Sequence, residues 1–157
     1  MADRPFCRLI VDADVLAAVI EQARSEAPLE CCGLLAGRVA SAAGVVEVRY
    51  PLVNEAASPV EFVSAARGMF DAVRDIDQRG LTVLAVYHSH PASPPVPSKT
   101  DLERNYSPDV VNIIISLQTE PPEVKGWWLR DAEFEPALLE VRETRLGGVP
   151  TALGGHA

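Results

Sequence analysis

The spacing of hydrophobic residues predicts two amphipathic helices. Between Asp12 and Pro28, apolar residues recur every three or four positions, so we predict a helix that Asp12 caps and that ends before Pro28. Ser64 can cap a second helix, which Gly80 terminates. Each helix is expected to bury one face, and the buried stripe predicted for the second consists of Met69, Phe70, Val73 and Ile76.

Several shorter apolar segments predict β-strands. Residues 31–36 form an apolar run that Gly37 closes, and Val45–Leu52 alternates apolar with polar residues, as a half-buried strand does. Leu81–Tyr87 and Val110–Leu117 are continuously apolar and rich in β-branched residues. This pattern favours central strands that are covered on both faces.

The later part of the chain is less regular. Pro91–Pro97 is too rich in proline for a helix or a strand interior, so we predict a loop, followed by a short helix at 98–106 that Ser98 caps. Val124–Leu129 and Phe134–Val141 fit either edge strands or a final helix. Strands interleaved with two long helices indicate the α/β class, with a single mixed β-sheet flanked by helices.

The composition is that of a globular protein, with 48% hydrophobic residues in a chain of 157. We predict one domain over 1–145 and a flexible glycine-rich tail over 146–157. The net charge of −8 disfavours nucleic acid and anionic membranes as partners. No signal peptide or membrane span is visible, and three cysteines do not make a disulfide framework, so a cytoplasmic location is expected.

Two histidines and an aspartate have the spacing of metal ligands. His88 and His90 lie two apart at the end of a predicted strand, so their side chains share one face, about 6.6 Å apart along the strand. Asp101 opens the next predicted helix and can project back toward them. Three protein ligands leave a fourth zinc position for water, as in catalytic sites. Each residue also has a structural interpretation, since paired histidines occur on exposed strands and Ser98 with Asp101 matches a capping box.

The joint pattern resembles a known family. Residues 88–91 (HSHP) and 98–101 (SKTD) resemble the JAMM (MPN+) metalloprotease motif, H-[ST]-H-P-x6-S-x-x-D. Upstream, residues 30–35 (ECCGLL) are similar to the family's E-x-C-G-[ILV]-L segment. The resemblance implies the MPN/JAMM fold, a cytidine-deaminase-like α/β sandwich, over approximately Arg8 to Val141.

The resemblance also implies a role for each matched residue. His88, His90 and Asp101 would bind one Zn²⁺ per chain. Glu30 would hold the attacking water, act as general base and pass the proton to the leaving amine. Ser98 would donate a hydrogen bond to the oxygen of the tetrahedral intermediate. These roles agree with general chemistry, because zinc lowers the pKa of bound water to about 7 and a nearby glutamate can accept its proton.

Neighbouring residues have less specific interpretations. Ser89 is expected to point away from the two histidines and to be structural. Cys32 is expected to be packed in the core, and Cys31 is either a buried structural thiol or a residue near the metal. The prolines of Pro91–Pro97 either shape a substrate groove or only connect the strand to the next helix.

Family resemblance alone suggests the substrate. It implies cleavage after the C-terminal Gly-Gly of a ubiquitin-like or sulfur-carrier protein, at a lysine linkage or before a C-terminal cysteine. The alternative is a non-catalytic MPN scaffold, which typically lacks one or more of the five motif residues that this chain retains. A zinc deaminase is disfavoured, since H-x-E and P-C-x-x-C are absent from the sequence. The sequence does not indicate an oligomeric state, the identity of the carrier or the metal used in the cell.

Overall fold

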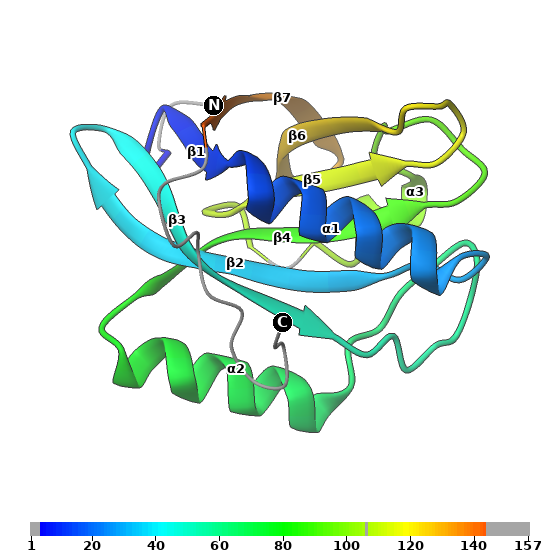
Figure 1. Ribbon diagram of the computed structural model, residues 1–157, viewed down its shortest axis with the longest axis horizontal. Helices are drawn as coiled ribbons and strands as arrows, with labels where there is room; N and C mark the ends of the chain where they lie inside the picture. The colour runs from blue at the N-terminus through cyan, green and yellow to red at the C-terminus, as the bar shows by residue number, and fades with distance from the viewer. Residues whose placement is uncertain (1–3, 106, 144–157) are drawn as a thin grey trace.

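A strongly curved mixed sheet forms the centre of the molecule (Figure 1). The structure is a computed structural model, and it describes residues 4–105 and 107–143. Within these residues the elements are β1 (Arg8–Asp12), α1 (Ala13–Glu26), β2 (Cys32–Ala40), β3 (Ala43–Leu52), α2 (Ala66–Gln78), β4 (Thr82–His90), α3 (Lys99–Glu103), β5 (Val111–Ser116), β6 (Glu123–Arg130) and β7 (Glu133–Arg142). The predicted glycine-rich tail, 146–157, lies outside the described residues.

The strands follow the order β1-β3-β2-β4-β5-β6-β7, and β1 also pairs with β7, which closes the sheet into a barrel. The pairings β1–β3, β1–β7 and β4–β5 are parallel and the others antiparallel. The prediction of one mixed sheet flanked by helices is confirmed. Both segments that the sequence left open between strand and helix are strands, β6 and β7, and the closure through β1 was not predicted.

The central strands β2 and β4 are buried on both faces. Leu35 and Tyr87 point into a core that includes α1 residues and Trp128. Leu34 and Val86 point into a second core, which α2 covers. Successive residues therefore alternate between two cores, as the twofold period of a strand requires. Among the described helices, none is long and apolar enough to cross a membrane.

The structure corrects two predicted boundaries. Gly37 does not end β2, which continues to Ala40. A Cβ atom at Gly37 would lie 1.9 Å from the carbonyl oxygen of Val45, so glycine serves a close strand approach at a register shift. Ser64 does not cap α2, which begins one residue later, after Ala65, without a side-chain cap.

Two predicted side-chain roles are also wrong. Phe70 and Val73 of α2 are 61% and 41% exposed, because the helix buries Ala72 in their place, while Ile76 is buried as predicted. Asp12 makes no capping hydrogen bond to α1. Its carboxylate accepts a hydrogen bond of 2.6 Å from Arg142 Nε, and this contact links β1 to β7 where the sheet closes.

Candidate metal centre

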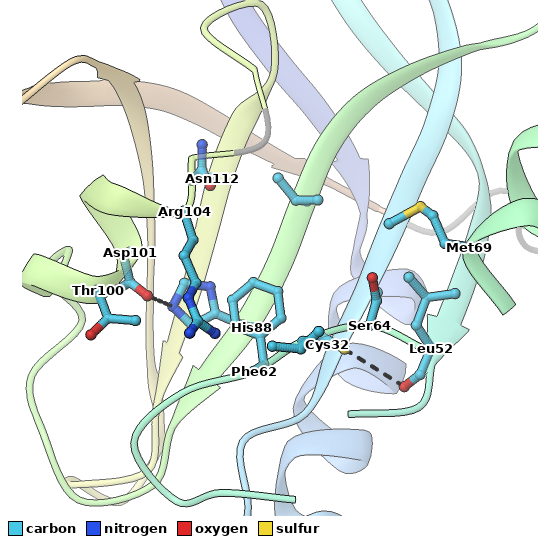
Figure 2. A pocket seen from close by; sticks show the side chains of 13 residues that line it. Cys32, Leu52, Phe62, Ser64, Met69, His88, Thr100, Asp101, Arg104 and Asn112 are labelled. Carbon is cyan, nitrogen blue, oxygen red and sulfur yellow. Dashed lines mark hydrogen bonds and ion pairs between the residues drawn. The ribbon is translucent and has the colours of Figure 1, made fainter. Parts of the chain in front are cut away.

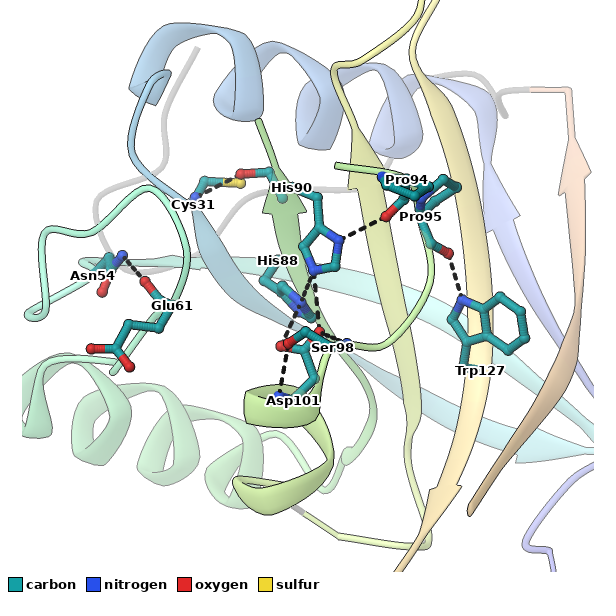
Figure 3. Close-up of polar contacts among 11 residues, drawn as sticks. Cys31, Asn54, Glu61, His88, His90, Pro94, Pro95, Ser98, Asp101 and Trp127 are labelled. Atoms are coloured by element: carbon teal, nitrogen blue, oxygen red, sulfur yellow. Dashed lines mark hydrogen bonds and ion pairs between the residues drawn. The ribbon is translucent and has the colours of Figure 1, made fainter. Parts of the chain in front are cut away.

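His88 and His90 are the last residues of β4 on the face that α2 covers. β5 pairs with β4 through His90 and β2 pairs with it as far as His88, so His88 lies in the middle of the sheet and His90 just beyond the end of the β2 ladder. The two side chains are only 2% and 3% exposed. Ser89 points the other way, as predicted, and its Oγ accepts a hydrogen bond of 2.8 Å from the backbone N–H of Cys31. Cys31 is labelled with His88 and His90 in Figure 3.

The short helix α3 directs Asp101 toward these histidines. Ser98 Oγ accepts a hydrogen bond from Asp101 N, and Ser98 N donates to Asp101 Oδ2, which together form a capping box. Asp101 Oδ1 lies 3.1 Å from His88 Nε2, and Oδ2 lies 3.1 Å from His90 Nε2. The capping and ligand interpretations are therefore compatible, because the capping box orients the same carboxylate that faces the histidines.

The three side chains fit a metal ion. The Nε2 atoms of His88 and His90 are 3.1 Å apart, and all three ligand atoms lie within 4.8 Å of one another. Tetrahedral zinc, with Zn–N distances of about 2.0–2.1 Å, separates its ligand atoms by about 3.3 Å. His90 Nδ1 donates to the carbonyl oxygen of Pro94 at 2.8 Å, which leaves Nε2 with a lone pair. A metal ion placed between these atoms would replace the protons that otherwise bridge His88, His90 and Asp101.

The protonation states of His88 and Asp101 also favour a metal. Burial lowers the pKa of His88, which favours the neutral imidazole that a metal binds. Burial alone would raise the pKa of Asp101, but the hydrogen bonds with His88 and His90 outweigh it and hold this pKa well below its usual range. The pKa of His90 is raised. Burial alone would lower it, but the hydrogen bonds with Asp101 and with the Pro94 carbonyl outweigh that effect.

The loop 91–97 supports His90 through its backbone. Besides the Pro94 contact, the carbonyl oxygen of Pro95 accepts a hydrogen bond of 2.9 Å from Trp127 Nε1. Ser116 Oγ donates to the carbonyl of the neighbouring Ser93 at 2.7 Å. β6 and β5 thus anchor the loop that orients His90. Sequence reasoning missed Trp127 and Ser116, since only strand pairing brings them to the loop.

Glu30 approaches the same site from the connection between α1 and β2. Its backbone N–H donates to Ser58 O at 2.8 Å, and its carbonyl accepts from Asn54 Nδ2 at 3.0 Å. The residue is 2% exposed, and its Oε1 has no hydrogen-bond partner among the described residues. Burial raises the pKa of Glu30 to about 8, with His90 opposing and Asp101 adding to the rise. A proton can therefore reside on this carboxyl near neutral pH.

A mostly apolar cavity adjoins the metal ligands. It has a volume of about 210 Å³, and its walls include His88, Asp101, Phe62, Met69 and Arg104 (Figure 2). The Phe62 ring stacks on the His88 imidazole, with centroids 4.7 Å apart and planes 26° from parallel. The loop between β3 and α2 thus contacts a candidate metal ligand directly.

Cys31, which immediately precedes β2, and Cys32, its first residue, are free, buried thiols that pack into opposite cores. Burial raises the pKa of Cys31 to about 11 and that of Cys32 to about 12, so both thiols are protonated at neutral pH. In the part of the chain that the structure describes, the cluster of potential ligand atoms contains neither cysteine. Packing is therefore the role that the structure gives to both.

The fold and the ligand cluster together define an α/β protein with a potential metal site at the end of its central strand. The family model described as prokaryotic homologs of the JAB domain matches residues 12–130. The chain therefore belongs to this family, and its resemblance to the JAMM/MPN+ proteins is confirmed.

Individual relatives agree with this assignment. A desampylase from Pyrococcus furiosus is 34% identical over 130 residues, which cover 83% of this chain and 87% of the relative. A CysO-cysteine peptidase from Mycobacterium tuberculosis is 30% identical over 110 residues, covering 70% and 74%. A solution structure of a protein from Desulfitobacterium hafniense matches with a TM-score of 0.78 and 31% identity, over 86% of this chain and 93% of that one.

Proposed function

We propose that this chain is a zinc-dependent hydrolase that cleaves the bond after the C-terminal Gly-Gly of a ubiquitin-like or sulfur-carrier protein. The observation that carries the proposal is the convergence of His88, His90 and Asp101, together with a buried carboxyl, Glu30, that interacts electrostatically with His90 and Asp101 and whose Oε1 has no partner among the described residues. The substrate class is supported by the relatives named desampylase and CysO-cysteine peptidase.

In this proposal His88, His90 and Asp101 hold the ion, and zinc supplies Lewis acidity and lowers the pKa of water. Glu30 accepts the proton of the attacking water at its free Oε1 and later delivers it to the leaving amine. Burial raises the pKa of Glu30 and a bound cation would lower it, and a carboxyl with a pKa near the working pH can both accept and release a proton.

Ser98 would stabilise the developing oxyanion. Its Oγ accepts the hydrogen bond from Asp101 N, so the hydroxyl hydrogen remains available to donate. One such donor to an oxyanion contributes about 3 kcal/mol in comparable sites. The capping box thus keeps the Ser98 oxygen beside the metal ligands without using its proton.

Burial of the site supports a Gly-Gly sequence at the scissile bond. The side chains that would hold the metal are at most 9% exposed. A substrate carbonyl can reach such a site most easily when the preceding residues lack side chains, because glycine permits close backbone approach.

The three free cysteines fit the reducing cytoplasm, where we place the reaction.

A non-catalytic scaffold explains the geometry less well. Burying a polar atom without a partner costs about 1–3 kcal/mol, and more for a charged group. In a protein that only binds partners, the unpaired Glu30 Oε1 would lower stability without serving any function. A general base requires a free oxygen at this position.

Mass spectrometry of candidate carriers tests the proposal. Ubiquitin-like carriers from the same organism are incubated with the zinc-loaded protein, either with an added C-terminal cysteine or linked to a lysine. We expect cleavage after Gly-Gly that disappears with Glu30→Gln and with metal-stripped protein. Absence of cleavage by a folded, zinc-loaded enzyme on every carrier would refute the substrate class, whereas cleavage by Glu30→Gln at the wild-type rate would refute the mechanism.

A further inference from the structure

Asn54 uses every hydrogen-bonding position of its side chain. The residue follows β3 and is 8% exposed. Its Nδ2 donates to the carbonyl oxygens of Glu30 at 3.0 Å and Glu61 at 3.1 Å. Its Oδ1 accepts from the backbone N–H groups of Ala56 and Val63, both at 3.0 Å. A buried amide that is satisfied on all sides is held in one orientation.

One end of this network fixes the backbone of Glu30. Asn54 Nδ2 holds the Glu30 carbonyl, and Ser58 O holds the Glu30 N–H from the same loop. In the same peptide group as the Glu30 carbonyl, Cys31 N donates to Ser89 Oγ. Since Glu30 precedes β2, these contacts take the place of the ladder hydrogen bonds that fix His88 and His90 in β4.

The other end of the network fixes the ring beside the metal ligands. Glu61 O and Val63 N, which both bond to Asn54, belong to the residues on either side of Phe62. Phe62 in turn stacks on His88 with a centroid distance of 4.7 Å. One side chain therefore connects the backbone of Glu30 with a ring that packs on a candidate metal ligand.

We infer that Asn54 is a positioning residue that sets the place of the Glu30 carboxyl relative to the metal ligands. The inference rests on the proposed role of Glu30 as general base. Within the described residues, the side-chain hydrogen bonds of Asn54 all go to backbone groups and none goes to a ligand atom of His88, His90 or Asp101. Its loss should therefore impair the use of the metal and leave the binding of the metal intact.

The test compares two substitutions at Asn54 with a control in the same loop. Asn54→Ala removes all four hydrogen bonds. Asn54→Asp keeps the oxygen that accepts from Ala56 and Val63 but loses the amide group that donates to Glu30 and Glu61. If Asn54→Ala does not fold, Asn54→Asp serves as the test variant. The matched control is Ser58→Ala, because Ser58 Oγ accepts only a loop hydrogen bond from Val60 N, at 3.2 Å, while its backbone carbonyl still holds Glu30.

We expect both Asn54 variants to lower kcat by about 100-fold, the effect of a misplacement of about 1 Å. Zinc affinity, measured by competition with a chelator, should stay within a factor of about three, well short of the loss that follows removal of a ligand's own partner. By NMR, hydrogen exchange of the Glu30 amide should accelerate in both variants. Ser58→Ala should leave kcat, zinc affinity and this amide unchanged.

Two results would overturn the inference. One is a parallel loss of zinc affinity and kcat, which would make Asn54 a general support of the whole site. The other is unchanged protection of the Glu30 amide in a folded Asn54 variant, which would show that Asn54 does not hold Glu30. The exchange measurement needs no substrate, so it decides the question even if wild-type protein cleaves no carrier, a result that would refute the proposed function alone.

Discussion

The metal ligands and the candidate base lie at the same site but are held in different ways. His88 and His90 belong to β4, and Asp101 belongs to the first turn of α3, so regular secondary structure fixes their backbones. Glu30 lies outside any helix or strand and depends on side chains and loop carbonyls for its position. Regular structure thus supports the part of the site that must bind an ion.

The side chains differ in the same sense. His90 and Asp101 are oriented by hydrogen bonds to Pro94 O and Ser98 N, whereas Glu30 Oε1 has no partner among the described residues. A metal ligand must keep its orientation, while a general base must exchange a proton with the substrate. If Glu30 is the general base, its backbone contacts would supply its rigidity and its unpaired oxygen would supply its reactivity.

The largest effect should separate binding of the metal from its use. Asp101→Asn removes a charged ligand oxygen, so zinc affinity should fall by more than about 100-fold, the upper range for loss of an outer partner. Glu30→Gln should keep zinc affinity and lower kcat by about 10²–10⁴, the usual contribution of a general base. Metal analysis and steady-state kinetics measure both. Equal loss of zinc in the two variants would make Glu30 a ligand.

The second prediction concerns the outer support of the metal side. Trp127→Phe keeps an aromatic ring against Phe134 but loses the hydrogen bond to Pro95 O. Because that bond anchors the loop that orients His90, zinc affinity should fall by up to about 10-fold, with kcat restored at saturating zinc.

Tyr50→Phe serves as the control for the Trp127 variant. It also removes one side-chain hydrogen bond, from the Tyr50 hydroxyl to Asp75, but neither of these residues lines the cavity beside His88 and Asp101. Its zinc affinity should equal that of the wild-type protein. Equal effects of the two variants on zinc would indicate that stability, and not loop position, controls metal binding.

The metal side could be predicted because its signals are local. His88 and His90 share a strand face through their spacing, and the capping box between Ser98 and Asp101 spans only three residues. The structure bears out both local patterns. Periodicity was less decisive at α2, where two neighbouring stripes are apolar and only packing against the sheet selects Ala72 and Ile76 over Phe70.

The base side could not be derived from local spacing. Glu30 receives its hydrogen bond from Asn54, 24 residues later, and only the family resemblance singled it out. Trp127 is likewise 32 residues from Pro95. Closure of the sheet depends on β1 meeting β7 at the other end of the domain. Such contacts depend on the register of paired strands, which one sequence does not specify.

The third prediction uses pH to test the burial of Glu30 in metal-free protein. Its pKa is about 8 when folded, against an ordinary value of 4.5. The folded state thus binds the proton more tightly, and the stability linked to this carboxyl is lost as the pH rises through that window. Glu30→Gln does not ionise, so its melting temperature should exceed that of wild type by more at about pH 9 than at about pH 5. A difference independent of pH would contradict this burial.

The smallest effect should come from the surface pair that joins the two sides. Arg104 follows α3, and its Nη1 lies 3.5 Å from Oε2 of Glu61, in the loop that holds Glu30. Both side chains are substantially exposed. Such pairs contribute under about 1 kcal/mol, so Arg104→Gln should barely change the free energy of unfolding or kcat. Lys99→Gln, which removes an exposed pair within α3, is the matched control. If Arg104→Gln lowered kcat as strongly as Asn54→Ala, the two sides would be coupled through this surface pair, and the buried hydrogen bonds of Asn54 would not be what positions the base.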